Sequence, residues 1–293
     1  MRRQASRITL GLSFAAAALA SLAAGLATTS AHATPQAQST LSVRMHDYAV
    51  DLSSRSVPAG LTRIRVTTSG SARHGLLLAR LHDGVTVSRF KHALDTKDGL
   101  AALPLASFDG GVDTLPGPGQ AWQMITALRP GTYVLVDGEE NGPRPNFDRG
   151  AIAALHVTTP IGTSAAAPKA AGSIGMVDFA FRIHLPASFH GHGWVRFANR
   201  GHDIHRIILL RLDPGVSFAS AYAAIHGHKD GNKQERPPGQ PIELISAVSP
   251  GFVGYLKLSL PPGRYVAACF EADQSTHLVP HTELGMIGHF TIA

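Results

Sequence analysis

Apolar and polar side chains alternate with a period of two along most of the chain. Ile64 and Val66 flank the charged Arg65, and Tyr133 and Leu135 share one face of another such run. Alternation of this kind predicts strands with one buried and one solvated face.

Each half of the chain also contains one stretch with helical spacing. Within residues 85–94, Val87, Phe90 and Leu94 lie three or four positions apart, and residues 216–225 match this stretch in the second half. Apolar residues at that spacing predict a short helix with one buried face. Pro-Gly pairs between the strands supply corners. The pattern predicts an all-β fold of two Greek-key β-sandwiches, each with one short helix inserted.

The chain repeats itself. A constant offset superposes the run that begins at His74 on the run that begins at His205, and apolar positions match nearly throughout. Almost the same offset places Tyr133 on Tyr265, and each of these tyrosines follows a Pro-Gly turn. A Pro-Gly turn that leads into a strand opening with Tyr predicts a tyrosine corner in each copy. Repetition over this length indicates two copies of one domain.

A segment of distinct composition marks the boundary between the two copies. Residues 158–173 are rich in Ala, Pro, Ser and Thr and lack a periodic apolar pattern, so they are predicted to be a linker. The first copy then spans residues 34–157, and the second copy spans residues 174–293.

The N-terminus has the features of a signal peptide. Arg2, Arg3 and Arg7 precede an apolar run over residues 8–26, and Ala31-His32-Ala33 has the small-x-small form of a cleavage site. We therefore expect residues 1–33 to be removed and the mature protein to be secreted or extracytoplasmic. No later run of apolar residues is long enough for a membrane span, so no transmembrane segment is expected after cleavage.

Composition and charge exclude some classes of protein. Hydrophobic residues make up 44% of the chain and charged residues 16%, which is typical of globular domains. The net charge of +6 falls to +3 without the three leader arginines, too little to indicate nucleic-acid binding. A single cysteine excludes an internal disulfide framework.

Four side chains of the second copy have metal-ligand chemistry. Cys269 ends a strand on its core-facing side, His281 and Met286 follow in the last loop, and His205 opens an earlier strand after Asn199-Arg200-Gly201. One thiolate, two imidazoles and one thioether form the ligand set of a blue-copper site, with methionine as the weak axial ligand.

At these positions the second copy resembles the cupredoxin superfamily, the blue-copper proteins. The resemblance rests on Gly263-x-Tyr265-x3-Cys269 and on His281-x3-Gly285-Met286, and it extends loosely over the first copy through the repeat. It implies a copper site with the ligands His205, Cys269, His281 and Met286.

The loop between the cysteine and the second histidine is longer than is usual in that superfamily. Its members place this histidine a few residues after the cysteine, whereas residues 271–280 intervene here. The loop must fold back for His281 to reach Cys269. His277 is a second candidate ligand within the loop, and the insertion could instead have removed the metal site.

The first copy keeps only one of the four candidate ligands. His74 corresponds to His205, whereas the other three positions carry Asp137, Asn146 and Ala151. The first copy is therefore predicted to bind no copper.

Two His-x-His pairs suggest a multicopper oxidase. His190-Gly191-His192 and His226-Gly227-His228 resemble the pairs that build a trinuclear cluster. In such oxidases histidines flank the cysteine, but Cys269 lies between Ala268 and Phe270. The connection from thiolate to cluster is missing, so these pairs are predicted to be polar loop residues.

The sequence therefore predicts an exported cupredoxin-like protein that binds one copper ion in the second copy, for electron transfer or copper holding. Its expected partner is a redox or copper-donor protein. No acid, base or nucleophile is expected beside the ligands, so enzyme activity is not predicted. The alternative is a metal-free extracellular binding or structural module in which Cys269 and His281 only pack.

Overall fold

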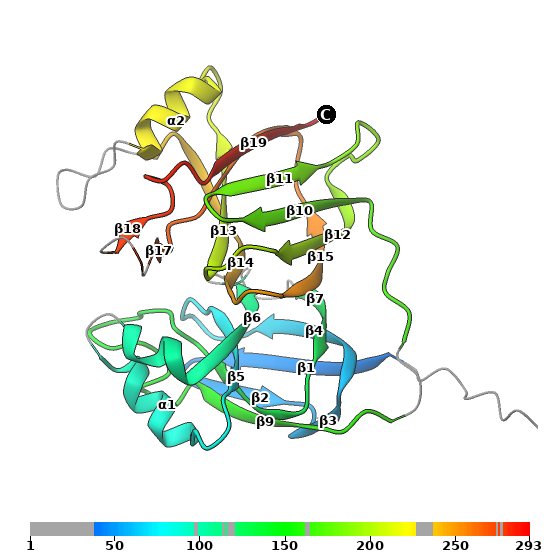
Figure 1. The fold of residues 1–293 in the computed structure, drawn as a ribbon, viewed down its shortest axis with the longest axis vertical. Helices are drawn as coiled ribbons and strands as arrows, with labels where there is room; N and C mark the ends of the chain where they lie inside the picture. Colours follow the sequence, from blue (N-terminus) through cyan, green and yellow to red (C-terminus); the bar gives the residue numbers. More distant parts are fainter. Residues whose placement is uncertain are drawn as a thin grey trace, which may run out of the picture. The chain divides into compact units, whose positions relative to one another are not determined.

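The computed structural model describes residues 38–96, 99–112, 115, 121–161, 165–226, 237–273, 275 and 278–293 (Figure 1). The predicted signal peptide and the side chains of His228 and His277 lie outside these ranges. Within the described ranges, no helix has the length and hydropathy needed to cross a membrane.

Strands dominate both copies, which confirms the all-β prediction. The first copy contains β1 (Ser39–His46), β2 (Ala49–Leu52), β3 (Ser56–Pro58), β4 (Gly60–Thr68), β5 (Leu76–Leu81), β6 (Ala106–Val112), β7 (Ala121–Leu128), β8 (Gly131–Val136) and β9 (Ile152–Thr158). The second copy contains β10 (Gly172–Val177), β11 (Ala180–His184), β12 (His192–Asn199), β13 (His205–Leu212), β14 (Gly239–Val248), β15 (Val253–Ser259), β16 (Gly263–Ala268), β17 (Ala272–Asp273), β18 (Val279–Pro280) and β19 (Ile287–Ile292).

The two copies have the same strand order, apart from β3, which has no counterpart among the described strands of the second copy. One sheet has the strand order β11-β10-β12-β15-β7-β4-β1-β2, and the other has the order β19-β16-β13-β14-β6-β5-β8-β9-β3. The first strand of each copy runs parallel to its neighbour, β1 to β4 and β10 to β12, while most other pairs are antiparallel. Each copy is thus a sandwich of two sheets. The predicted linker, residues 158–173, lies between β9 and β10 except at its ends, because Thr158 ends β9 and Gly172 and Ser173 open β10.

Both sheets continue from one copy into the other. Tyr255 of β15 pairs with Ile125 of β7, and Val248 of β14 pairs with Asp109 of β6. The repeat predicts two copies, but it does not predict that their edge strands pair with each other.

The predicted alternation is present in the strands. Ile64 and Val66 of β4 are fully buried, whereas Arg65 between them is exposed. They belong to one apolar cluster that also includes Leu78 of the opposite sheet and Leu256 of the second copy. This core lies between the two sheets.

Strands β8 and β16 depart from the alternating pattern because both of their faces are buried. Val134 and Val136 of β8 pack against Phe90 of helix α1 (Val87–Leu94) on the outer side of the sheet. Val266 and Ala268 of β16 pack in the same way under α2 (Phe218–His226). A helix on the outer face of the sheet therefore explains why β8 and β16 carry apolar residues at both alternating sets of positions.

Both predicted helices are confirmed. The side chain of Thr86 caps α1 by accepting a hydrogen bond from the main-chain N–H of Arg89 at 3.1 Å. The first copy also has a 3₁₀ helix, η1 (Leu100–Leu105), that the sequence did not predict. It is short and contains Pro104, so it lacks the usual pattern of a helix.

The predicted tyrosine corners are confirmed. The hydroxyl of Tyr265 donates to the main-chain oxygen of Pro261, and the hydroxyl of Tyr133 accepts from the main-chain N–H of Arg129 at 3.0 Å. Each corner ties a core strand to the turn that precedes it. In the second copy that strand leads directly to Cys269.

Candidate metal centre

Three candidate ligands meet at one end of the second copy. His205 opens β13, Cys269 follows β16, and His281 follows β18. Nδ1 of His205 lies 3.1 Å from Nδ1 of His281, and Sγ of Cys269 lies 3.9 Å and 3.4 Å from these two nitrogens. All three side chains are fully buried.

The loop before His205 is held by Asn199. Its side-chain amide donates to the main-chain oxygens of Asp203 at 2.8 Å and Val248 at 2.9 Å, and its oxygen accepts from the N–H of Gly201 at 3.0 Å. These bonds fix the loop between β12 and β13. The position of the His205 ring at the start of β13 follows from this loop.

The long loop folds back as the resemblance requires. Strands β17 and β18 pair with each other and take up the extra residues, and the N–H of His281 then donates to the main-chain oxygen of Glu271 at 2.8 Å. The separation between Cys269 and His281 in the sequence therefore does not separate them in space.

The main chain of Met286 is hydrogen-bonded to two other candidate ligands, His281 and Cys269. Its N–H donates to the oxygen of His281 at 2.8 Å, and its oxygen accepts from the N–H of Cys269 at 3.2 Å. Gly285 precedes it with φ at 99°, a left-handed conformation that favours glycine. The side chain of Met286 is fully buried.

The thiol of Cys269 accepts hydrogen bonds from the main chain of Arg206 and Glu271. The N–H of Arg206, the residue after His205, points at Sγ at 3.4 Å. The Arg206 side chain forms an ion pair with Glu271, two residues beyond the cysteine. These contacts connect the start of β13 to the end of β16, which carry the candidate ligands His205 and Cys269.

Burial sets the protonation of these groups. It lowers the pKa of His205 to about 4, with the charge of His281 adding to the effect, and it lowers the pKa of His281 as well. Burial raises the pKa of the Cys269 thiol to about 12. The imidazoles are therefore neutral near pH 7, as metal ligation requires, and a metal that binds the sulfur must displace its proton.

The donor atoms fit a first-row metal ion. Ligand distances of about 2.0–2.1 Å to imidazole nitrogen and about 2.3 Å to thiolate sulfur, as known for zinc, place the donors of one ion roughly 3–4 Å apart. The separations of 3.1, 3.4 and 3.9 Å lie in this range. Nδ1 of each histidine lies within 4 Å of the sulfur and of the other Nδ1 atom, so the three donor atoms can share one ion. A trigonal set of two imidazoles and one thiolate favours copper.

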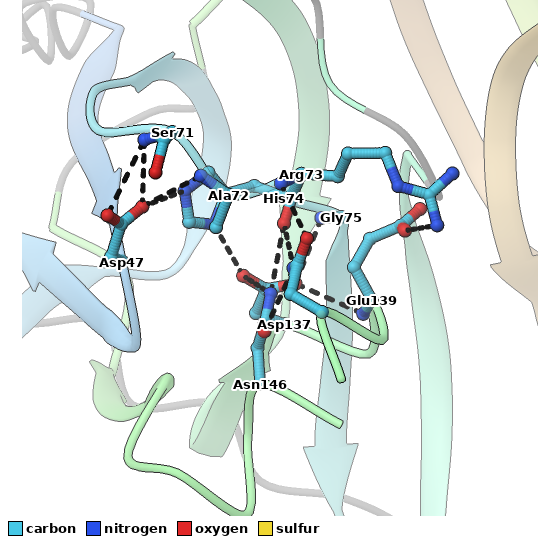
Figure 2. A network of polar contacts seen from close by, with 10 residues as sticks. Asp47, Ser71, Ala72, Arg73, His74, Gly75, Asp137, Glu139 and Asn146 are labelled. Atoms are coloured by element: carbon cyan, nitrogen blue, oxygen red, sulfur yellow. Dashed lines mark hydrogen bonds and ion pairs between the residues drawn. The ribbon is translucent and has the colours of Figure 1, made fainter. Parts of the chain in front are cut away.

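The corresponding position in the first copy holds a hydrogen-bonded network (Figure 2). Asp137 stands in place of the cysteine and lies 2.7 Å from Nδ1 of His74, and Nδ2 of Asn146 donates to it at 3.0 Å. The N–H groups of Gly75 and Glu139 also donate to Asp137, at 3.0 Å and 3.2 Å. The carboxylate thus joins the elements that correspond to those carrying the candidate ligands in the second copy.

Main-chain bonds confirm the equivalence of these positions. The N–H of Asp137 donates to the oxygen of Ala151, and the N–H of Ala151 donates to the oxygen of Asn146, both at 3.0 Å. The second copy has the same bonds at Cys269, His281 and Met286. The loop geometry is therefore retained where the ligands differ.

Two residues next to the site, Asp178 and Phe179, were not predicted from the sequence. Asp178 and Phe179 form the turn between β10 and β11, and they lie against His205 and His281, respectively. The repeat could have indicated Asp178, because Asp47 is an acid at the corresponding position of the first copy.

The prediction that the His-x-His residues lie in loops is wrong for His192, which opens β12, and for His226, which ends α2. His192 is exposed and contacts the hydroxyl of Ser259 at 3.2 Å, and His226 lies 3.6 Å from Glu283. Among the described residues, the single group of at least three His, Cys, Asp or Glu side chains with metal-ligand spacing is His205, Cys269 and His281.

Comparisons with known proteins find structures that contain copper. No protein-family model matches the chain, and no curated protein matches its sequence. Among solved structures, the chain is similar to an auracyanin from the photosynthetic bacterium Roseiflexus castenholzii, with 20% identity over 42% of this chain and 99% of that chain and a TM-score of 0.30.

Two longer structures match both copies. A multicopper oxidase has 16% identity over 87% of this chain and 88% of its own, with a TM-score of 0.24. A copper nitrite reductase from Nitrosomonas europaea has 13% identity over 88% of this chain and 94% of its own, with a TM-score of 0.23. Because all these scores are low, the proposal below depends on the geometry of the three converging side chains.

Proposed function

We propose that the second copy binds one copper ion through His205, Cys269 and His281, with Met286 as axial ligand, and that the protein is an exported electron-transfer or copper-holding protein. The observation that carries this proposal is the convergence of three buried donor atoms, all within 4.8 Å of one another. Sulfur ligands stabilise Cu(I) and imidazoles keep Cu(II) bound, so this set suits both oxidation states.

The chain's own residues keep the donors in place. His205 and Cys269 sit at the ends of hydrogen-bonded strands, and main-chain bonds fix the loop that carries His281 and Met286. A bound copper ion supplies one-electron redox chemistry. Because the donors are already assembled and shielded from water, a change of oxidation state requires little movement of the protein.

A carrier role fits this site better than substrate turnover. Both histidine side chains are fully buried, so a substrate has no direct approach to their metal-facing nitrogens. We infer that the partner is a redox or copper-donor protein that acts at the surface. Rapid exchange of electrons with a small mediator would support electron transfer, and release of copper to a chelating peptide without reduction would support copper holding.

Titration with Cu(II) tests the proposal. The purified protein is expected to take up one copper per chain and to develop an intense visible thiolate-to-copper band. Cys269→Ser is expected to abolish the band, because it removes the sulfur donor. His192→Ala, a change at an exposed histidine, is the control and should leave the band unchanged. A colourless wild type after metal loading would favour the metal-free module.

Substitution of Met286 tests the axial role. Met286→Gln is expected to retain copper and to lower the reduction potential by about 59 mV or more, the equivalent of a tenfold stabilisation of Cu(II) over Cu(I). Met286→Leu keeps the apolar volume but removes the sulfur, so its potential should move in the opposite direction. Voltammetry measures both, and two unchanged potentials would remove Met286 from the ligand set.

A further inference from the structure

One turn contacts both candidate ligand histidines from outside. Asp178 and Phe179 connect β10 to β11 (Figure 1). Oδ1 of Asp178 lies 3.9 Å from Nε2 of His205. The ring of Phe179 meets the ring of His281 edge to face, with centroids 5.3 Å apart and an interplanar angle of 72°.

The inner nitrogen of His205 can bind a metal only in one tautomer. Its Nδ1 faces His281 and Cys269, so a lone pair there requires the proton of the neutral ring to be on Nε2. Nε2 is buried and has no hydrogen-bond partner among the described residues. The Asp178 carboxylate is the described acidic group within 4.0 Å of it, and a small shift would bring its oxygen into hydrogen-bond range.

Asp178 is held in its place by the loop before β13. It accepts from the main-chain N–H of His202 and lies beside the ring nitrogen Nδ1 of the same residue, both at 2.6 Å. The hydrogen bond from the His202 side chain lowers the pKa of Asp178, which keeps the carboxylate charged.

The approach of Asp178 to His205 depends on Gly201. A Cβ atom at this position would lie 2.3 Å from Oδ1 of Asp178 and 2.8 Å from Nε2 of His205. The loop therefore passes between the two side chains, and only glycine leaves room for both.

Phe179 occupies a costly main-chain conformation. Its φ is 58°, in the left-handed region that is unfavourable for a residue other than glycine. The counterpart Tyr48 has φ 64°, but its ring stacks against Arg149. Both copies keep the turn, whereas the contact of an aromatic ring with a ligand histidine belongs to the second copy.

We propose that Asp178 and Phe179 are positioning residues of the metal centre, Asp178 selecting the Nε2–H tautomer of His205 and Phe179 fixing the ring of His281 and excluding water from it. This assignment rests on the proposed copper site. Hydrogen bonds from outside the ligand shell orient metal-binding histidines and tune the metal. In this chain one turn performs both tasks.

Asp178→Asn tests the role of the carboxylate. The affinity for Cu(II) is expected to fall about 10–100-fold. Loss of the negative charge weakens Cu(II) binding more than Cu(I) binding, and each tenfold difference raises the potential by about 59 mV. Asp47→Asn is the matched control, because Asp47 lies at the same 3.9 Å from Nε2 of His74 and accepts main-chain N–H groups in the same way (Figure 2). It should leave both copper affinity and potential unchanged.

A second measurement needs no copper. Nitrogen NMR of the metal-free protein is expected to show His205 with its proton on Nε2, and Asp178→Asn should reduce the fraction of this tautomer. A wild-type His205 protonated on Nδ1, or the same tautomer fraction in both proteins, would overturn the role of Asp178. A wild type that shows the expected tautomer but binds no copper would instead overturn the proposed function.

Phe179→Gly tests the aromatic contact without adding strain, because glycine accepts the positive φ. A chelator is expected to remove copper about tenfold faster from this variant. Tyr48→Gly makes the same change in the first copy and should leave the rate unchanged. Equal removal rates in Phe179→Gly and wild type would overturn the role of Phe179.

Discussion

Replacing Asp137 with alanine is expected to lower the free energy of unfolding by about 3–5 kcal/mol. The carboxylate is fully buried and faces donors from His74, Gly75, Glu139 and Asn146. Alanine would leave these buried groups without their acceptor, and each unsatisfied donor costs about 1–3 kcal/mol. Urea unfolding of the metal-free protein measures the loss.

The control is an acid of the same copy that lies at the surface. Asp51 is exposed and pairs with His46 at 2.6 Å. Asp51→Ala is expected to cost less than about 1 kcal/mol, because exposed ion pairs contribute little. If Asp137→Ala costs no more than Asp51→Ala, the network does not stabilise the first copy.

The two copies represent two solutions for the same place in one fold. In the first copy, the carboxylate of Asp137 fills the space among three loops and satisfies their polar groups. Nε2 lacks a partner among the described residues in both copies, at His74 as well as at His205 and His281. The copies differ at Nδ1: that of His74 pairs with Asp137, whereas those of His205 and His281 face each other. In the second copy the donor atoms of His205, Cys269 and His281 thus face one another with no carboxylate in the place of Asp137. This contrast supports copper over simple packing.

Local patterns in the sequence predict much of the fold. Alternation predicts the burial of Ile64 and Val66, and the turn before Tyr265 predicts its corner, because these features depend on residues close in the chain. The pairing of β7 with β15 depends on two edges that are far apart in sequence, and periodicity carries no information about the partner of an edge strand. The apolar residues on both faces of β8 likewise become clear only when α1 is in place.

The candidate site could be predicted in part, from the residue types and from the repeat. The repeat and the ligand chemistry single out His205, Cys269 and His281, and the structure brings these three together. The sequence did not predict whether Cys269 and His281 lie close together, because the loop between them folds back only through the pairing of β17 with β18. The contacts of Asp178 could not be predicted, since they need a turn and a glycine loop from different strands to meet.

Transfer of the candidate ligands to the first copy is expected to create a copper site there. In a Cys269→Ser background, which removes the original site, Asp137→Cys and Asn146→His would supply a thiolate and an imidazole beside His74. The main-chain bonds at these positions match those of the second copy, so the new side chains should start from the right places. Copper uptake is expected to return from none to about one ion per chain, with a visible thiolate-to-copper band.

Adding Ala151→Met should then supply an axial sulfur and shift the potential, although Met at a fully buried Ala costs about 1–3 kcal/mol in packing. The matched control carries Asp137→Ser in place of Asp137→Cys and should remain colourless. Circular dichroism establishes that each variant is folded before metal is added. A folded variant with Cys and His that binds no copper would show that the repeated loops alone do not define the site, and that contacts present only in the second copy, such as Phe179 on His281, are also required.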